Sequence, residues 1–307
     1  PFLAVGVSFL AAVLISFSRR YPNVRESWSV IASFIKFGLI ISMVPGVLAG
    51  VTYEWTLFQI TDTIGFTLRA DSAGILFACL AALLWIPINF YSIGYMRCNN
   101  EHEQTGYFAA FAICMSSVMG IAMASNLLTF FFFYELLTIA SYPLVLHKRN
   151  EEALLASRKY LIYTLISGQL FLAGLVAVYC ISGTMDFKAG GFLTTDMAPT
   201  WQLQLIFLIM ILAGSVKAAV MPLHGWLPAA MIAPTPVSAL LHAVAVVKTG
   251  VFAVLRIIGF VFGPKLLADI GTADILAWFA AGSIIISSLI AIQQDNLKRR
   301  LAFSTIG

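Results

Sequence analysis

The chain has 307 residues, of which 60% are hydrophobic and 10% are charged, and its mean hydropathy is +0.93. Soluble domains carry about 25% charged residues, so this composition excludes an ordinary soluble enzyme and indicates a lipid bilayer. The net charge of +4 decides little, because the position of each charge matters more than the sum. The four cysteines are scattered without a CxxC pair, and there is no phosphate loop, dinucleotide fingerprint or HExxH motif. We therefore expect no metal, no cofactor and no nucleic-acid partner.

Apolar segments of about 20 residues, each long enough to cross roughly 30 Å of hydrocarbon, recur along the chain. Of the 18 Lys and Arg residues, eleven fall in the odd-numbered connections between these segments and three in the even-numbered ones. Positive residues concentrate on the cytoplasmic side, so the odd-numbered connections are predicted to be cytoplasmic. The expected protein is an integral, multi-pass component of a bacterial-type inner (cell) membrane. Its predicted spans are 2–18, 29–49, 72–95, 107–125, 127–146, 160–182, 201–221, 236–262 and 273–292, with a tenth beginning near 301.

Both ends of the chain are unlike natural termini. Pro1 leads directly into an apolar run without a preceding Met, and the last residues, Leu301 to Gly307, begin a new apolar segment. We expect the sequence to be part of a longer protein.

An acidic residue lies deep inside one apolar run. Glu135 follows four Phe residues and a Tyr, and it is the only one of the 14 acidic residues well inside an apolar segment. An ionised carboxylate in hydrocarbon is costly unless it is paired or hydrated, so such a residue is a functional candidate. Lys217 and Lys248 occupy equally apolar runs and are its candidate partners. The alternative is a structural acid that pairs with a neighbouring helix and never titrates.

A break is predicted in the span that carries Lys217. Pro222 lacks an N–H group and clashes with the carbonyl four residues earlier, and Gly225 and Pro228 extend the disruption. Unpaired backbone groups at membrane depth are tolerated only where protein buries them or water reaches them. Lys217 precedes the break by about one and a half turns, which predicts that it shares a hydrated pocket there. His224 lies within the break, where satisfying backbone groups is the favoured interpretation of its role.

The following span carries a second set of ionisable residues. Thr235 and Pro236 are typical of a helix N-cap and first turn. Lys248 lies six residues after His242, or about 9 Å along a helix, which a short water chain can bridge. His242 titrates near neutral pH and is a natural intermediate proton carrier; the alternative is a histidine that only hydrogen-bonds across helices. Gly250 is expected to allow local distortion or close packing.

Three further residues favour structural interpretations. Lys36 and Arg256 lie within spans, and their long side chains are expected to reach the membrane surface. Tyr160 is expected to be an ordinary aromatic residue of the membrane interface.

At these residues the chain resembles the antiporter-like membrane subunits of respiratory complex I, Mrp-type cation/proton antiporters and membrane-bound hydrogenases. The resemblance covers roughly residues 70–307. It is carried by four stretches: Phe131 to Leu136, Lys217 to Pro228, Ala233 to His242 and Asp295 to Thr305.

The resemblance implies an all-α polytopic membrane protein with an antiporter-like fold of inverted five-helix repeats and a broken seventh helix. This chain would hold an N-terminal portion of about nine to ten transmembrane helices. Residues 1–106 would form the N-terminal transmembrane helices, 107–262 the first five-helix proton-channel repeat, and 263–307 the incomplete start of the second repeat.

The resemblance also implies residue roles. Glu135 matches the family's acidic residue of helix five, Lys217 the lysine of broken helix seven, and His242 and Lys248 match positions of helix eight. The expected function is that of a proton-translocating subunit of a multisubunit cation/proton antiporter or respiratory complex, with other membrane subunits as partners and Na⁺ or K⁺ as candidate ions. The run before Lys248 is most like that of the Mrp-type D subunit.

Several alternatives stay open. The chain would equally suit a pumping subunit of a complex I-type NADH-quinone oxidoreductase, or a membrane-bound hydrogenase or carbon-uptake partner of the same fold. A catalytic redox subunit that carries quinone or metal is a third class, but the lack of cofactor-ligand spacing argues against it. No catalytic centre is expected within this chain.

Overall fold

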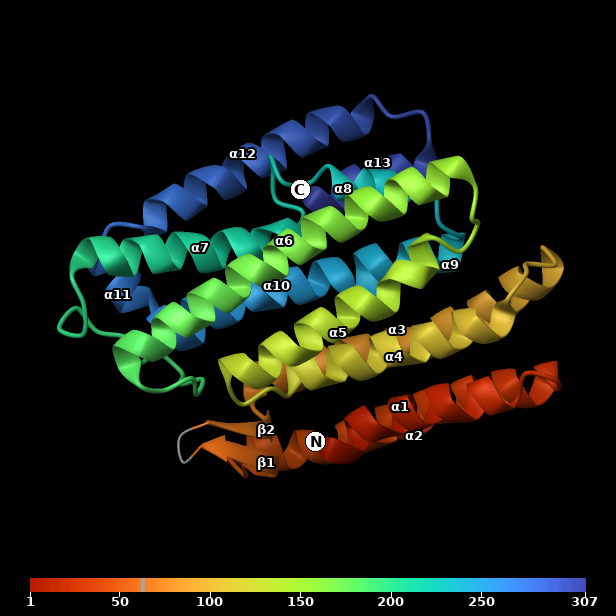
Figure 1. Ribbon diagram of the computed structural model, residues 1–307, viewed down its shortest axis with the longest axis horizontal. Coiled ribbons are helices and arrows are strands. Elements are labelled where there is room, and N and C mark those ends of the chain that lie inside the picture. The colour runs from red at the N-terminus through yellow and green to blue at the C-terminus, as the bar shows by residue number, and fades with distance from the viewer. Residues whose placement is uncertain (62–63) are drawn as a thin grey trace.

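The computed structural model describes residues 1–61 and 64–307 (Figure 1). Within these residues, eight helices are long and apolar enough to cross a membrane. The shorter apolar helix α1 (Phe2–Phe17) precedes them. The eight are α2 (Pro22–Leu48), α3 (Ser72–Cys98), α4 (Gln104–Ala122), α5 (Leu127–Val145), α6 (Glu151–Ser182), α7 (Thr200–Ala218), the composite helix Thr235–Phe262 and α12 (Ala273–Ile292).

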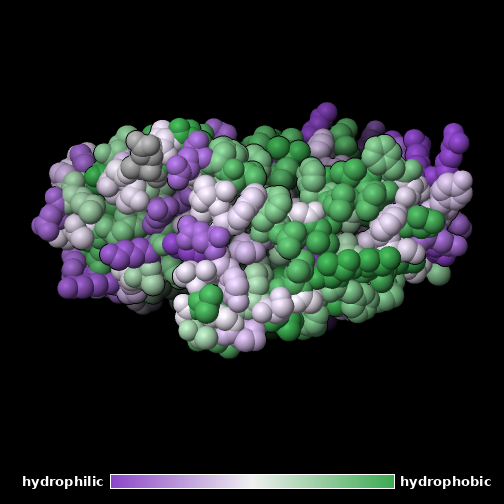
Figure 2. Space-filling model, turned by 90° about the horizontal axis from the view of Figure 1, so that it is seen from below, coloured by the Kyte–Doolittle hydropathy of each residue, from purple (hydrophilic) through white to green (hydrophobic). Residues whose placement is uncertain are grey.

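The helices lie side by side, and their connections alternate between the two ends of the bundle (Figure 1). Helix α1 packs on α2 and α4, α5 lies between α4 and α6, and α7 packs on α6. Viewed from the side of α1 and α2, apolar residues cover a broad area between hydrophilic residues at the two ends (Figure 2). Exposed apolar surface is the arrangement expected of a bundle whose solvent at mid-depth is hydrocarbon. The predicted multi-pass helical architecture is therefore confirmed.

Residues 50–71 do not form the plain loop implied by the predicted spans. Strands β1 (Tyr53–Thr61) and β2 (Ile64–Ala70) pair in an antiparallel hairpin at one end of the bundle (Figure 1). Their sequences are rich in aromatic and β-branched residues, which suit a pleated, half-buried surface. The Thr67 N–H donates to the Thr129 hydroxyl at 3.1 Å, and the Thr67 carbonyl accepts from the Ser125 N–H at 3.1 Å. These bonds fix the hairpin on the start of α5.

The last third of the chain is more interrupted than predicted. The composite helix consists of α9 (Thr235–Ala239), the π-helix η1 (Leu240–Val244), α10 (Val246–Arg256) and a second π-helix η2 (Ile257–Phe262). Short helices fill the remaining connections: α8 (Trp226–Ala230), α11 (Pro264–Asp269) and α13 (Leu297–Ile306). Thr235 is the first helical residue rather than a side-chain cap, because its hydroxyl caps no N–H group.

Two basic residues predicted to reach the membrane surface are buried instead. The Lys36 side chain is 0% exposed, and its Nζ donates to the Met115 carbonyl at 3.0 Å and lies 4.3 Å from the centre of the Trp85 ring. Arg256 is 1% exposed and forms a two-pronged ion pair with Asp71, with one Nη2–Oδ1 distance of 2.8 Å. Both predictions were wrong because neighbouring helices supply partners closer than the water.

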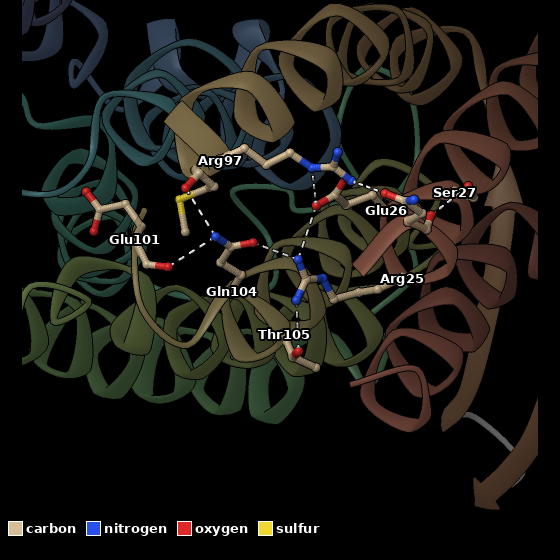
Figure 3. A network of polar contacts seen from close by, with 9 residues as sticks. Arg25, Glu26, Ser27, Arg97, Glu101, Gln104 and Thr105 are labelled. Atoms are coloured by element: carbon tan, nitrogen blue, oxygen red, sulfur yellow. Dashed lines mark hydrogen bonds and ion pairs between the residues drawn. The ribbon is translucent and has the colours of Figure 1, made fainter. Parts of the chain in front are cut away.

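A second acidic residue is also buried, near one end of the bundle. Helix α2 begins at Pro22, earlier than the predicted span, so Glu26 lies within the helix and is 4% exposed. Glu26 pairs with Arg25 and Arg97, and Arg25 Nη2 donates to Gln104 Oε1 at 2.7 Å (Figure 3). This network ties the ends of α2, α3 and α4 together.

Candidate functional site

Helix α7 ends immediately after Lys217. The Val220 N–H bonds to the Ser215 carbonyl at 2.9 Å and the Ala219 N–H to the Val216 carbonyl at 3.1 Å. This is the Schellman pattern of a helix C-terminus, and Ala219 takes its left-handed position with φ of 59°. The Lys217 side chain is 0% exposed. A cation in the last turn interacts favourably with the negative end of the helix dipole, by about 0.3–1 kcal/mol.

The interruption in the chain covers residues 219–225, before α8 begins at Trp226. Pro222, His224 and Gly225 lie in this stretch, and Pro228 lies inside α8. Freed backbone groups find partners here: Trp226 Nε1 donates to the Val216 carbonyl at 2.7 Å. The Met221 N–H donates to the Ser283 hydroxyl of α12 at 3.0 Å. Protein contacts therefore stabilise the break at membrane depth, as a bilayer requires.

The amine of Lys217 meets α5 at the residue before Glu135. Lys217 Nζ donates to the Tyr134 carbonyl and lies 3.3 Å from the centre of the Tyr134 ring. The Tyr134 hydroxyl in turn lies 2.9 Å from the Ser167 hydroxyl of α6 and donates to the Ala213 carbonyl of α7 at 3.1 Å. Tyr134 thus fixes the relative positions of α5, α6 and α7 around the lysine.

Glu135 lies near Lys217 without touching it. The ion pairs among the described residues do not include this one, so the carboxylate oxygens and Nζ are more than 4.0 Å apart. Their charges are nevertheless close enough to interact. Glu135 Oε1 is buried and has no hydrogen-bond partner among the described residues. Geometry and charge together make this carboxylate an unsatisfied acceptor next to a buried amine.

The position of the Glu135 carboxylate depends on a glycine. A Cβ built at Gly168 of α6 would lie 2.2 Å from Glu135 Oε1, so any larger residue there would displace the carboxylate. On its other side, Glu135 lines an apolar groove of about 800 Å³ between α1, the hairpin and α5. It is the only ionisable side chain among the groove's described lining residues. The residue is half-buried, and its acid group lies at the boundary between the packed helices and this groove.

The remaining predicted residues lie on the composite helix, which packs against α7. His242 lies inside η1, where the Ala245 N–H reaches back five residues to the Leu240 carbonyl at 2.8 Å. Its Nδ1 lies 3.3 Å from the Thr305 hydroxyl of α13. Lys248 is half-buried in α10 and its charge interacts with that of His242. Single-turn π-helices occur often at functional sites, and no residue pattern in the sequence predicted this one.

Gly250 brings α10 directly onto the end of α7. A Cβ at Gly250 would lie 2.1 Å from the Ala218 nitrogen and 2.5 Å from the Lys217 carbonyl carbon. The close packing expected of this glycine is therefore present, and it places the helix of Lys248 against the backbone of Lys217. The structure thus gathers Glu135 and Lys217 at one point, with His242 and Lys248 on the adjoining helix.

Sequence reasoning missed several contributors to this site. Tyr134 and Ser167 hold the three helices, and Gly168 makes room for the carboxylate. Tyr160 was wrongly expected at the interface: it is 0% exposed, and its hydroxyl lies 2.6 Å from that of Ser141. The only available signal was the spacing of Ser167 from Tyr160, seven residues or about two helical turns, which places both on one face of α6.

The curated relatives include proteins of two named kinds. An Na(+)/H(+) antiporter subunit of Alkalihalophilus pseudofirmus is 30% identical over 97% of this chain and 37% of the relative. The NAD(P)H-quinone oxidoreductase chain 5 of a Picosynechococcus species is 30% identical over 89% of this chain and 41% of the relative. The chain therefore spans about two fifths of the length of these relatives.

A solved structure has the same fold. A chain of the membrane-bound sulfane sulfur reductase, an archaeal respiratory membrane complex, superposes with a TM-score of 0.88. The match covers 99% of this chain and 62% of that chain at 22% sequence identity. Residues 124–307, which include Glu135, Lys217, His242 and Lys248, match a single family model. The chain belongs to the NADH:quinone oxidoreductase/Mrp antiporter transmembrane family.

Proposed function

We propose that this chain translocates protons as an antiporter-like subunit of a multisubunit cation/proton antiporter or respiratory complex in a bacterial-type cell membrane. The observation that carries the proposal is the fully buried Lys217 at the end of broken helix α7, with the unsatisfied Glu135 carboxylate beside it. Intramembrane ionisable residues are functional by default, and broken helices beside them are typical of ion-binding sites in transporters.

The separation of Glu135 and Lys217 suits a switch better than a static ion pair. Beyond 4 Å, two unit charges at an effective dielectric constant of 20 interact by less than about 4 kcal/mol. Moving one charge across 100 mV is worth about 2.3 kcal/mol. Because the two energies are similar, a small change in the distance between the groups is enough for the lysine to bind or release a proton.

The onward route in this proposal follows the composite helix. His242 and Lys248 interact electrostatically with each other, and Gly250 packs α10 on the backbone of Lys217. Water molecules would carry the proton between these side chains, with His242 as the intermediate carrier. In this proposal residues 107–262 form one proton-channel repeat, residues 1–106 form the helices that precede it, and residues 263–307 begin a second repeat.

Two assemblies suit the proposal, and each has support among the relatives. An antiporter, in which Na⁺ or K⁺ moves against protons and other membrane subunits are partners, is favoured by the similarity to an Na(+)/H(+) antiporter subunit. A redox-driven pump of the complex I type is favoured by the similarity to a quinone oxidoreductase chain. The D-type subunit of an Mrp antiporter remains the specific assignment suggested by the residues before Lys248.

The test compares Glu135→Gln and Lys217→Ala with the wild type in the native complex, reconstituted into vesicles that contain a pH-sensitive dye. Cation-induced or redox-induced pH change distinguishes the two assemblies. Each variant is expected to lower proton flux by at least about tenfold, because it removes a charge interaction of more than about 1.4 kcal/mol. Matched controls are Glu152→Gln and Lys188→Ala, which change exposed residues. Wild-type flux in both site variants would refute the assigned roles.

A further inference from the structure

Two histidines and a glutamate meet at the end of the bundle that carries the predicted cytoplasmic loops. Glu101 and His102 lie between α3 and α4, and His147 follows the last residue of α5. Their candidate ligand atoms all lie within 4.8 Å of one another. None of these three residues belongs to the line of charges described above.

His147 is a buried imidazole without a hydrogen bond on one nitrogen. The residue is 7% exposed, and its Nε2 has no hydrogen-bond partner among the described residues. The nearest carboxylate oxygen, Glu101 Oε2, is 3.6 Å away, too far for a hydrogen bond. Burial, with a smaller contribution from His102, lowers the pKa of His147 below its ordinary 6.5, so the ring is neutral at pH 7. A neutral Nε2 aimed at a carboxylate is left unsatisfied in either tautomer.

His102 is oriented as metal-bound histidines are. Its Nε2 lies 3.0 Å from the His147 carbonyl, and since a carbonyl oxygen can only accept, Nε2 carries the proton. In a neutral ring the lone pair is then on Nδ1, free to bind a cation. Histidine ligands commonly donate their second ring N–H to a backbone carbonyl in this way. The two imidazole rings stack with centroids 5.0 Å apart.

The surrounding contacts hold these side chains in place. Gln104 Nε2 donates to the Glu101 carbonyl at 3.1 Å, and Gln104 itself is held by Arg25 (Figure 3). The Tyr107 ring packs edge-on against the His147 ring with centroids 5.6 Å apart. The loop bearing Glu101 and the imidazole of His147 are thus anchored independently before any ion arrives, as a preorganised site requires.

We propose that Glu101, His102 and His147 bind one divalent transition-metal ion of the zinc type, with a fourth position open to water. Zinc prefers tetrahedral sites with nitrogen or oxygen ligands at about 2.0–2.2 Å, which places neighbouring ligand atoms roughly 3.3–3.5 Å apart. The 3.6 Å separation of His147 Nε2 and Glu101 Oε2 is close to that value. The ion joins the α3–α4 loop to the α5–α6 loop. Zinc-type spacing was absent from the sequence because the two histidines are 45 positions apart.

The test measures zinc binding to the purified full-length protein, in its native complex and in detergent, by competition with a chromophoric zinc chelator. Wild type is expected to bind one Zn²⁺ at this site, and His102→Ala, which changes an exposed residue, to weaken binding at least about tenfold. His147→Ala should do the same if the variant folds. The matched control is Glu103→Gln, which alters the exposed neighbour that pairs with Arg149 and leaves the three ligands intact.

Cobalt provides a second measurement that does not depend on folding of the His147 variant. Co²⁺ bound to wild type should give the intense visible bands of a four-coordinate ion, and His102→Ala should lose them. Zinc affinity that is equal in wild type and His102→Ala would overturn the proposal, as would affinity lost equally in Glu103→Gln. Because the readout is metal binding rather than proton flux, this result is independent of the function proposed above.

Discussion

Gly250→Ala is expected to force α10 away from the end of α7. The new Cβ would lie 2.1 Å from the Ala218 nitrogen, 2.5 Å from the Lys217 carbonyl carbon and 2.7 Å from the Ala218 Cα. Favourable contacts between heavy atoms begin near 3.5 Å, so the two backbones must separate by about 1 Å. All three atoms are backbone atoms, so no side-chain rotation relieves the clash.

The energetic cost can be bounded from this geometry. Overpacking typically costs about 1–3 kcal/mol, and three backbone contacts indicate the upper end of that range. Replacing Gly by Ala within a helix returns about 1 kcal/mol of helix propensity. We therefore expect a net destabilisation of about 2 kcal/mol. We also expect proton flux to fall at least about tenfold, because Lys217 moves with the end of α7 relative to α5.

The assay pairs thermal unfolding of the purified protein with proton flux in vesicles. Gly259→Ala is the matched control, since it lies in the same composite helix and a Cβ there meets nothing within 4 Å. Gly250→Ala should lower both the unfolding midpoint and the flux, while Gly259→Ala should lower neither. Equal losses in the two variants would show that backbone flexibility matters at these glycines, and the close-packing argument would then be wrong.

Three other substitutions test separate contacts. Gly168→Ala should lower proton flux with little loss of thermal stability, because its Cβ displaces the flexible Glu135 carboxylate rather than backbone; unchanged flux would show that the position of the carboxylate is unimportant. Asp71→Asn should destabilise the fold by about 2–4 kcal/mol in a thermal or chemical unfolding assay, since it leaves the buried Arg256 guanidinium unpaired; a smaller loss would mean that its aromatic neighbours suffice. Lys36→Met should leave the unfolding midpoint unchanged or raise it, because the amine has a single carbonyl partner in a fully buried site; a lower midpoint would make that bond structural.

Hydropathy was sufficient to locate most of the helices, because each span must bury its own backbone hydrogen bonds and expose about 20 apolar residues to lipid. The predicted span 273–292 coincides with α12, and the predicted span 72–95 ends three residues before α3 does. The hairpin 53–70 was missed because a search for long apolar runs passes over short alternating strands. The two π-helices were missed because a one-residue insertion leaves the hydrophobic pattern almost unchanged.

Residue chemistry alone identified the ionisable candidates, since Glu135 and Lys217 are conspicuous in apolar runs wherever the helices lie. Which groups meet was a matter of packing between helices distant in sequence. Arg256 found Asp71 across 185 positions, and Lys36 found the Met115 carbonyl across 79, where periodicity within one helix carries no information. A side chain's partner depends on the neighbouring backbone, and only the assembled bundle places that backbone within hydrogen-bond distance.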